Sequence, residues 1–323
     1  MSTPDTLHIR CGSDIREKLV AGGVVGDYLE FSDPVCQGPL PPGMVDSGDA
    51  LIERRAHFIT REYGMPFGEA RRKLLAEWQG LKDARERDRL LLWFEHDLYD
   101  QACLIRLLAW FRRNPRRTGG EMALVTLDRH PAVDRFIGLG QLAPADLAEL
   151  VPTAEPVTAA MLRAAADAWG AFRSPDPEEI CALAETGTPD LPFLAPALRR
   201  HLQELPWTSD GLSLTERLTL RAAAYRPSPV ADLFRAVQDI DPQPFLGGLM
   251  FEAVARRLEN APRPALARDG DGRLAPTRHG EALLAGVADW LDWNTPEHWV
   301  GAVDLANDQP AWRWDEDAGT VVR

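Results

Sequence analysis

The sequence predicts an α/β protein. An open, mostly parallel sheet with flanking helices forms the N-terminal part, and the C-terminal half is mostly helical with a winged-helix-like unit. Three observations support this fold class. Strand and helix patterns alternate up to about residue 152, as in a parallel sheet with helical connections. The stretch LLLWF at 90–94 is apolar throughout, like a strand buried on both faces. Three helical patterns and a hairpin pattern follow one another between 213 and 277.

The elements of the first part are expected in simple alternation. Apolar and alternating runs predict strands, and apolar residues at helical spacing predict the helices between them. The glycines at 22–23 close the first helix, and Asn114-Pro115 ends the last one. The predicted strands are 6–11, 27–31, 90–94 and 121–127, and the predicted helices are 15–23, 49–63, 67–88 and 98–113.

The run VPTAEPVT at 151–158 reads as a linker. It separates a ligand-binding domain at 1–152 from a helical connector at 153–207 and a winged-helix-like domain at 208–323. In the last of these, helices are expected at 213–224, 228–240, 244–260 and 278–291, and Asp-Gly pairs mark a hairpin turn within 264–277. A tryptophan-rich tail with short strand-like pieces ends the chain.

Composition narrows the classes of function. The net charge is −13, which disfavours a nucleic-acid partner because duplexes are bound largely through phosphate neutralisation. Only three of the 36 basic residues are lysines, so an anion is expected to meet a guanidinium. No apolar run approaches the roughly 18 residues of a membrane span, and the N-terminus lacks a signal-peptide pattern. The four cysteines form no CxxC pair, which disfavours structural zinc and favours a reducing cytoplasm.

Polar side chains follow each predicted strand. In a parallel sheet these positions meet at one edge, where ligands of α/β proteins bind. They are Gly12, Ser13 and Asp14 after the first strand, Asp33 after the second, Glu95, His96 and Asp97 after the third, and Asp128 after the fourth.

The first of these groups has two readings. Gly12 and Ser13 at the start of a helix are suited to hold an anion, although Asp14 would repel it unless a metal or an arginine intervenes. The alternative is that Ser13 or Asp14 only caps the helix. The segment is neither GxGxxG nor a P-loop.

The third group is the strongest candidate for catalysis. His96 with Glu95 or Asp97 is a plausible acid–base pair. A structural reading explains Asp97 and Asp100 as a helix cap and its first turn, and the carboxylates could instead hold Mg²⁺. Asp100 and Gln101 are further candidates for substrate binding.

Two more predicted helices each allow two interpretations of their function. Arg54 lies on the helix at 49–63, from which it would reach an anionic substrate or form a surface salt bridge. The candidate recognition helix at 244–260 mixes Arg256 and Arg257 with glutamates, so packing or dimerisation is expected before DNA binding.

Three segments resemble a known bacterial family. HIRCGSD at 8–14, FSDPVCQGPLP at 31–41 and LWFEHDLYDQACLIRLL at 92–108 are similar to motifs of the family named domain of unknown function 1835. The resemblance covers about the first 130 residues. It departs at Ser13-Asp14, where many relatives have the reverse order. It implies a site at these three motifs, whereas the family has no settled activity.

The sequence therefore predicts an enzyme that acts by acid–base chemistry on a small anionic substrate bearing phosphate, sulfate or carboxylate. A hydrolase or transferase is expected, with no covalent nucleophile motif and no required cofactor beyond Mg²⁺ as a candidate. The C-terminal half would cover the site or bind a second copy or a partner protein. The alternative is a ligand-sensing, transcription-associated regulator.

Overall fold

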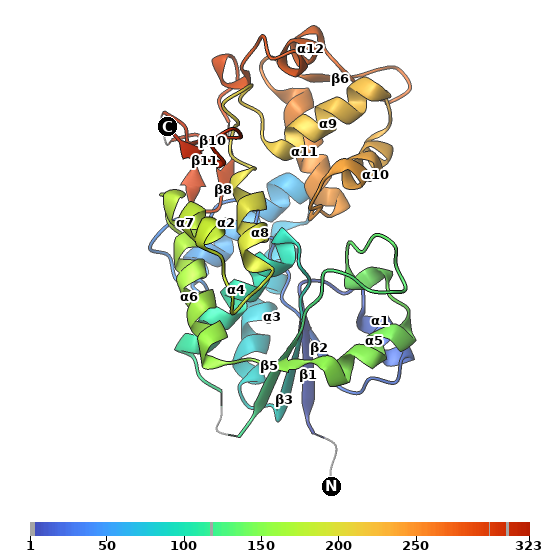
Figure 1. Ribbon diagram of the computed structural model, residues 1–323, viewed down its shortest axis with the longest axis vertical. Coiled ribbons are helices and arrows are strands. Elements are labelled where there is room, and N and C mark those ends of the chain that lie inside the picture. Colours follow the sequence, from blue (N-terminus) through green and yellow to red (C-terminus); the bar gives the residue numbers. More distant parts are fainter. Residues whose placement is uncertain (1–3, 117–118, 297, 308–309) are drawn as a thin grey trace.

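The structure is a computed structural model that describes residues 4–116, 119–296, 298–307 and 310–323 (Figure 1). The α/β class and the mostly parallel sheet are confirmed. Among the described residues, no helix is both long and apolar enough to cross a bilayer.

The N-terminal part is built on a sheet in which the described residues form five strands in the order β2-β1-β3-β4-β5. The first four are parallel, and β5 is antiparallel to β4. The strands are β1 (Thr6–Arg10), β2 (Asp27–Glu30), β3 (Arg89–Trp93), β4 (Glu121–Val125) and β5 (Glu155–Pro156).

Helices cover both faces of this sheet, which explains why β3 carries apolar side chains on each of them. Leu91 and Trp93 pack under α1 and α5, while Leu90 and Leu92 belong to the larger core on the other face. The helices of this part are α1 (Arg16–Ala21), α2 (Asp49–Tyr63), α3 (Phe67–Ala84), α4 (Leu98–Arg113) and α5 (Pro144–Leu150), with short 3₁₀ turns η1 (Leu139–Gln141) and η2 (Val151–Thr153).

The remaining chain is mostly helical. Its first helix, α6 (Ala159–Phe172), packs beside α4, and most of the elements that follow lie beyond the carboxyl ends of the parallel strands (Figure 1). Its core is continuous with that of the larger sheet face. Its other elements are α7 (Glu178–Thr186), α8 (Leu194–Leu202), α9 (Leu214–Tyr225), α10 (Val230–Ile240), α11 (Gly248–Asn260), β6 (Leu266–Arg268), β7 (Leu274–Pro276), α12 (Arg278–Leu284), η3 (Trp290–Asp292), β8 (Trp299–Val300), β9 (Val303–Asp304), β10 (Arg313–Asp315) and β11 (Thr320–Val322).

Several local predictions need correction. The expected linker at 151–158 contains β5, which pairs with β4 at the sheet edge. The helix expected at 67–88 ends at Ala84, and the one expected at 278–291 ends at Leu284 because Gly286 adopts a positive φ of 66°. Helix α1 begins at Arg16 with Ile15 at its N-cap and no side-chain cap. Neither Ser13 nor Asp14 therefore caps it.

Candidate functional site

The sheet order places a cavity between β1 and β3. From β1 the chain turns through α1 to β2 on one side, whereas β3 and β4 lie on the other side. Such a reversal leaves a crevice at the carboxyl ends of the two central strands, where open α/β sheets bind ligands. Residues 10–14 and, after β3, Glu95, Asp97, Tyr99 and Asp100 line a cavity of about 500 Å³ there, a volume ordinary for a small-molecule site.

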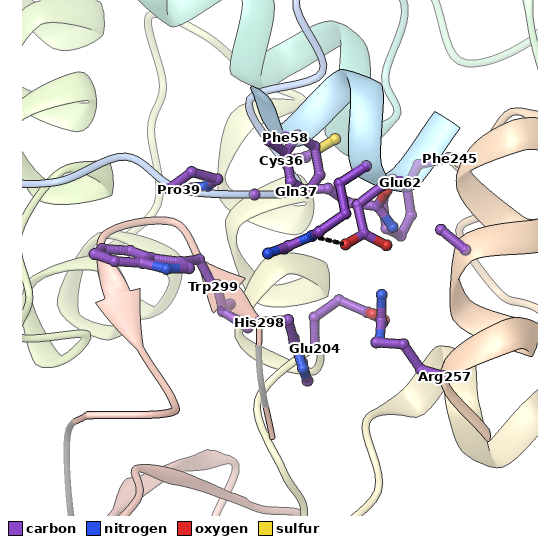
Figure 2. A pocket seen from close by; sticks show the side chains of 14 residues that line it. Cys36, Gln37, Pro39, Phe58, Glu62, Glu204, Phe245, Arg257, His298 and Trp299 are labelled. Atoms are coloured by element: carbon purple, nitrogen blue, oxygen red, sulfur yellow. Dashed lines mark hydrogen bonds and ion pairs between the residues drawn. The ribbon is translucent and has the colours of Figure 1, made fainter. Parts of the chain in front are cut away.

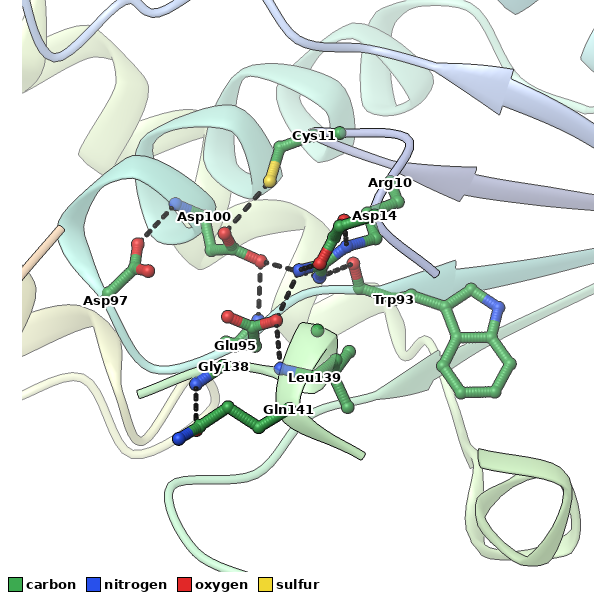
Figure 3. Close-up of polar contacts among 12 residues, drawn as sticks. Arg10, Cys11, Asp14, Trp93, Glu95, Asp97, Asp100, Gly138, Leu139 and Gln141 are labelled. Atoms are coloured by element: carbon green, nitrogen blue, oxygen red, sulfur yellow. Dashed lines mark hydrogen bonds and ion pairs between the residues drawn. The ribbon is translucent and has the colours of Figure 1, made fainter. Parts of the chain in front are cut away.

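Arg10, the last residue of β1, lies at the centre of the site (Figure 3). Only 5% of its side chain is exposed. Its Nε and Nη2 donate to the two carboxylate oxygens of Asp14 over 2.7 and 2.9 Å. Its Nη2 also donates to Glu95 Oε1, and its Nη1 contacts Asp100 Oδ1 at 3.3 Å. Burial by itself would lower the pKa of Arg10, but the charges of Glu95 and Asp100 raise it well above its usual value.

Glu95 follows β3 and is also buried. Its Oε1 accepts from Arg10 and from the backbone N–H of Leu139, the latter at 2.5 Å. Burial, and next the negative charge of Asp100, raise the pKa of Glu95 to about 8. This carboxyl is therefore protonated at neutral pH unless an additional positive charge is bound beside it.

Asp97 and Asp100 share the first turn of α4. Asp97 is the N-cap and accepts from the backbone N–H of Asp100 at 2.8 Å. The Asp100 side chain does not accept from the backbone N–H of Asp97, as it would in a capping box. Its Oδ1 accepts from the backbone N–H of Glu95 at 2.8 Å, and its Oδ2 accepts from the Cys11 thiol at 2.9 Å. Burial, followed by the charges of Asp100 and Glu95, raises the pKa of Asp97 well above its usual value.

The charges of the site are unbalanced. Among the described residues that line the cavity, Arg10 is the one cationic side chain, and it faces four carboxyl groups: Asp14, Glu95, Asp97 and Asp100. One oxygen from each of the last three lies within 4.8 Å of the others. Glu95 Oε2 and Asp97 Oδ2 accept no hydrogen bond within the described part of the chain. Protons or a hard cation must compensate for this excess of negative charge.

Cys11 does not provide a nucleophile. Its thiol is buried and donates to Asp100. Burial, and next the charge of Asp100, raises the pKa of Cys11 well above its usual value. Because the thiolate is the reactive form, this cysteine is chemically inert and serves to orient Asp100.

A loop that sequence reasoning missed closes one side of the cavity. Residues 137–141 bring the backbone against Glu95 and Asp14, and a Cβ at Gly138 or Gly140 would lie 2.7 Å from Glu95 Oε2 or 2.6 Å from Asp14 Oδ2. Gln141 Oε1 accepts from the N–H groups of Ile137 and Gly138, and Lys18 donates to the carbonyl of Gly140 at 2.6 Å. The two glycines in FIGLGQL were the available signal.

The predicted residues Gly12, Ser13, Asp14, Glu95, Asp97 and Asp100 line this cavity together. His96 does not. Its ring packs near those of Phe136 and Phe193, with centroids 6.0 and 6.3 Å away, and its buried Nδ1 has no hydrogen-bond partner in the described structure. Within the described residues His96 forms no hydrogen bond with Glu95 or Asp97, so the predicted pairing is not seen there.

Four other predicted binding residues lie outside the cavity. Asp33 is buried in ion pairs with Arg55 and Arg106 at 2.7 and 2.8 Å, a structural position. Arg54 is exposed on α2, since the neighbouring Arg55 is the one that turns inward. Asp128 is exposed as well. Gln101 is buried and donates to the carbonyl of Glu95, but its side chain lines a different cavity.

Comparison of the chain with models of known protein families and with curated proteins finds no match. The family resemblance of the three sequence motifs therefore stays a prediction. The cavity is interpreted from its own geometry.

Proposed function

We propose that the chain is an enzyme that hydrolyses or transfers a phosphate-bearing group of a small substrate in the cavity between β1 and β3. A divalent cation such as Mg²⁺ takes part. The observation that carries the proposal is the set of four carboxyl groups around one fully engaged arginine at the point where the sheet order reverses.

The charge balance favours a bound cation. With its carboxyl groups ionised, the cavity repels an anionic substrate, and Arg10 is already shared among Asp14, Glu95 and Asp100. Mg²⁺ is commonly held by one or two carboxylates and completes its shell with water and substrate phosphate. Asp97 Oδ2 is free for this role, and Gly12 and Ser13 supply polar backbone to the same cavity.

Glu95 is the group best suited to proton transfer. A catalytic acid or base works best when its pKa lies near the working pH, and the pKa of Glu95 is raised to about 8. Arg10 and the N–H of Leu139 fix its Oε1, and its Oε2 accepts no hydrogen bond within the described residues. In this scheme Glu95 exchanges a proton with the attacking or leaving oxygen, while Asp97 binds the cation.

The test compares Asp97→Asn with His96→Ala. Titration calorimetry with MgCl₂, followed by inorganic phosphate in its presence, should show binding to the unaltered protein. Asp97→Asn should weaken Mg²⁺ binding by about tenfold or more, which corresponds to about 1.4 kcal/mol. His96→Ala should bind Mg²⁺ as the unaltered protein does, because His96 does not line the cavity. Equal Mg²⁺ affinity in both variants, or none in the unaltered protein, would contradict the proposal.

For residues 208–323 we propose a winged-helix-like unit that serves as a packing module. Helices α9, α10 and α11 precede the β6–β7 hairpin, and Ser228 forms an isolated bridge with Leu274 of that hairpin. Arg256 on α11, the candidate recognition helix, donates to the carbonyl of Glu62 on α2. A helix held against the N-terminal part in this way is poorly placed to enter a DNA groove.

The junction of these two parts supports the packing role (Figure 2). Phe58 and Glu62 of α2 and Arg257 of α11 face a small cavity together with Glu204 and His298. Its volume is about 30 Å³, room for one or two water molecules. It is too small for a substrate and indicates close packing of α11 against α2.

A further inference from the structure

A second cavity lies beyond the carboxyl end of β4, the strand next to β3. Its volume is about 510 Å³. Five segments line it: the start of α4, the end of β4 with the residues after it, the stretch 150–155, Met161 of α6, and the loop 189–193 before α8. The sheet edge and the helical part of the chain thus enclose it together.

The floor of this cavity is apolar. Leu104, Leu124, Val125 and Leu191 line it, and each is at most 4% exposed. Among the described residues, the buried Oγ1 of Thr126, which also belongs to the lining, has no hydrogen-bond partner. Such a floor suits an apolar group, while Arg129, Glu155 and Asp190 add exposed polar side chains to the lining.

The second cavity lies one strand away from the site between β1 and β3. Gln101 lines it and donates to the carbonyl of Glu95, which lines the first cavity. Strands β3 and β4 pair in parallel up to Trp93 and Val125. Glu95 and Leu127, one from each lining, therefore both lie two residues beyond the same pair.

We infer that the second cavity binds the organic group of the substrate, which is a phosphate ester of an apolar, ring-sized group. This inference rests on the proposed function, because the first cavity would hold the phosphate and the cation. The carboxyl groups of the first cavity suit the cation and the phosphate, and the apolar floor of the second lies one strand away.

The experiment uses three ligands in the presence of MgCl₂: inorganic phosphate, 1-naphthol and 1-naphthyl phosphate. Calorimetry should show that 1-naphthyl phosphate binds about tenfold or more tightly than inorganic phosphate, because one molecule engages both cavities. Thr153→Trp places a large side chain at the exposed rim of the second cavity. It should remove this advantage and leave the affinity for inorganic phosphate unchanged. Thr153→Ala is the matched control and should keep the advantage.

The outcomes separate the two proposals. If inorganic phosphate binds and 1-naphthyl phosphate binds no more tightly, the inference is overturned and the proposed function stands. The inference is also overturned, and the proposed function stands, if Thr153→Trp still binds 1-naphthyl phosphate more tightly than inorganic phosphate while it melts at the same temperature as the unaltered protein. A third outcome is that neither inorganic phosphate nor 1-naphthyl phosphate shows phosphate-dependent binding, whereas 1-naphthol binds and Thr153→Trp abolishes the binding of 1-naphthol. This outcome supports the apolar cavity and contradicts the proposed function.

Discussion

The raised pKa of Glu95 couples the site to pH. Burial and the charge of Asp100 raise it from 4.5 to about 8. The folded value exceeds the unfolded one, so the associated stability is fully present below pH 4.5 and is lost as the pH rises through about 8. A cation bound beside Glu95 favours the ionised carboxylate and opposes this loss.

We therefore expect the stabilisation by Mg²⁺ to grow with pH up to about pH 8 and then to level off. Thermal unfolding at a series of pH values, with and without MgCl₂, measures it as the increase in melting temperature. Glu95→Gln should flatten this dependence, since its amide does not titrate. An Mg²⁺ effect that is the same at every pH would show that Glu95 does not face the cation.

Single residues also show how far the sequence could predict the site. Asp14, Asp97 and Asp100 were predicted because they follow strand ends. His96 lies at a bend after β3, where its ring packs near Phe136 and Phe193, while Glu95 and Asp97 line the cavity. Arg10 gave no local signal, since Glu95 and Asp100 lie 85 and 90 residues away in the chain.

At the scale of elements, the loop at 137–141 determines the shape of the site. Gly138 and Gly140 allow the backbone to approach two carboxyl groups, and Gln141 and Lys18 hold the loop in place. The alternation of strands and helices could be predicted from the apolar pattern. The position of this loop could not, because it depends on contacts with β3 and α1.

Gly138→Ala should therefore disturb the site. The added Cβ would lie 2.7 Å from Glu95 Oε2, and such overpacking typically costs about 1–3 kcal/mol. We expect weaker Mg²⁺ binding by calorimetry and a lower midpoint of urea unfolding. Gly170→Ala in α6 is the control, because open space surrounds Gly170, and it should stabilise the fold by about 0.5–1 kcal/mol. Unchanged Mg²⁺ binding in Gly138→Ala would count against the role of the loop.

At the scale of the whole molecule, buried charges join segments that are distant in sequence. Asp46 accepts from Trp169 Nε1 at 3.0 Å and from Arg173 Nη1 at 3.3 Å, both on or directly after α6. It also accepts from Arg113 at the end of α4 at 3.1 Å. The proline-rich loop before α2 is thereby fixed to the helical part of the chain.

Asp46→Ala should destabilise the whole fold. Removal of one partner from a buried ion network leaves uncompensated charge and costs about 3–5 kcal/mol. Urea unfolding should show this as a single transition at lower denaturant concentration, since one core spans both parts. Asp167→Ala, an exposed position on α6, should change stability by about 0.5 kcal/mol or less. A similarly small effect in Asp46→Ala would show that the network is not what joins these segments.

The two-residue strand β5 has a consequence for self-association. An uncovered sheet edge offers a row of free N–H and C=O groups to which another chain can add a strand. Beside β4, this edge ends in Glu155 and Pro156, and proline has no N–H to donate. The opposite edge, β2, carries Asp27 and Glu30. Because one border is short and contains a proline and the other is charged, both discourage the addition of a strand from another molecule.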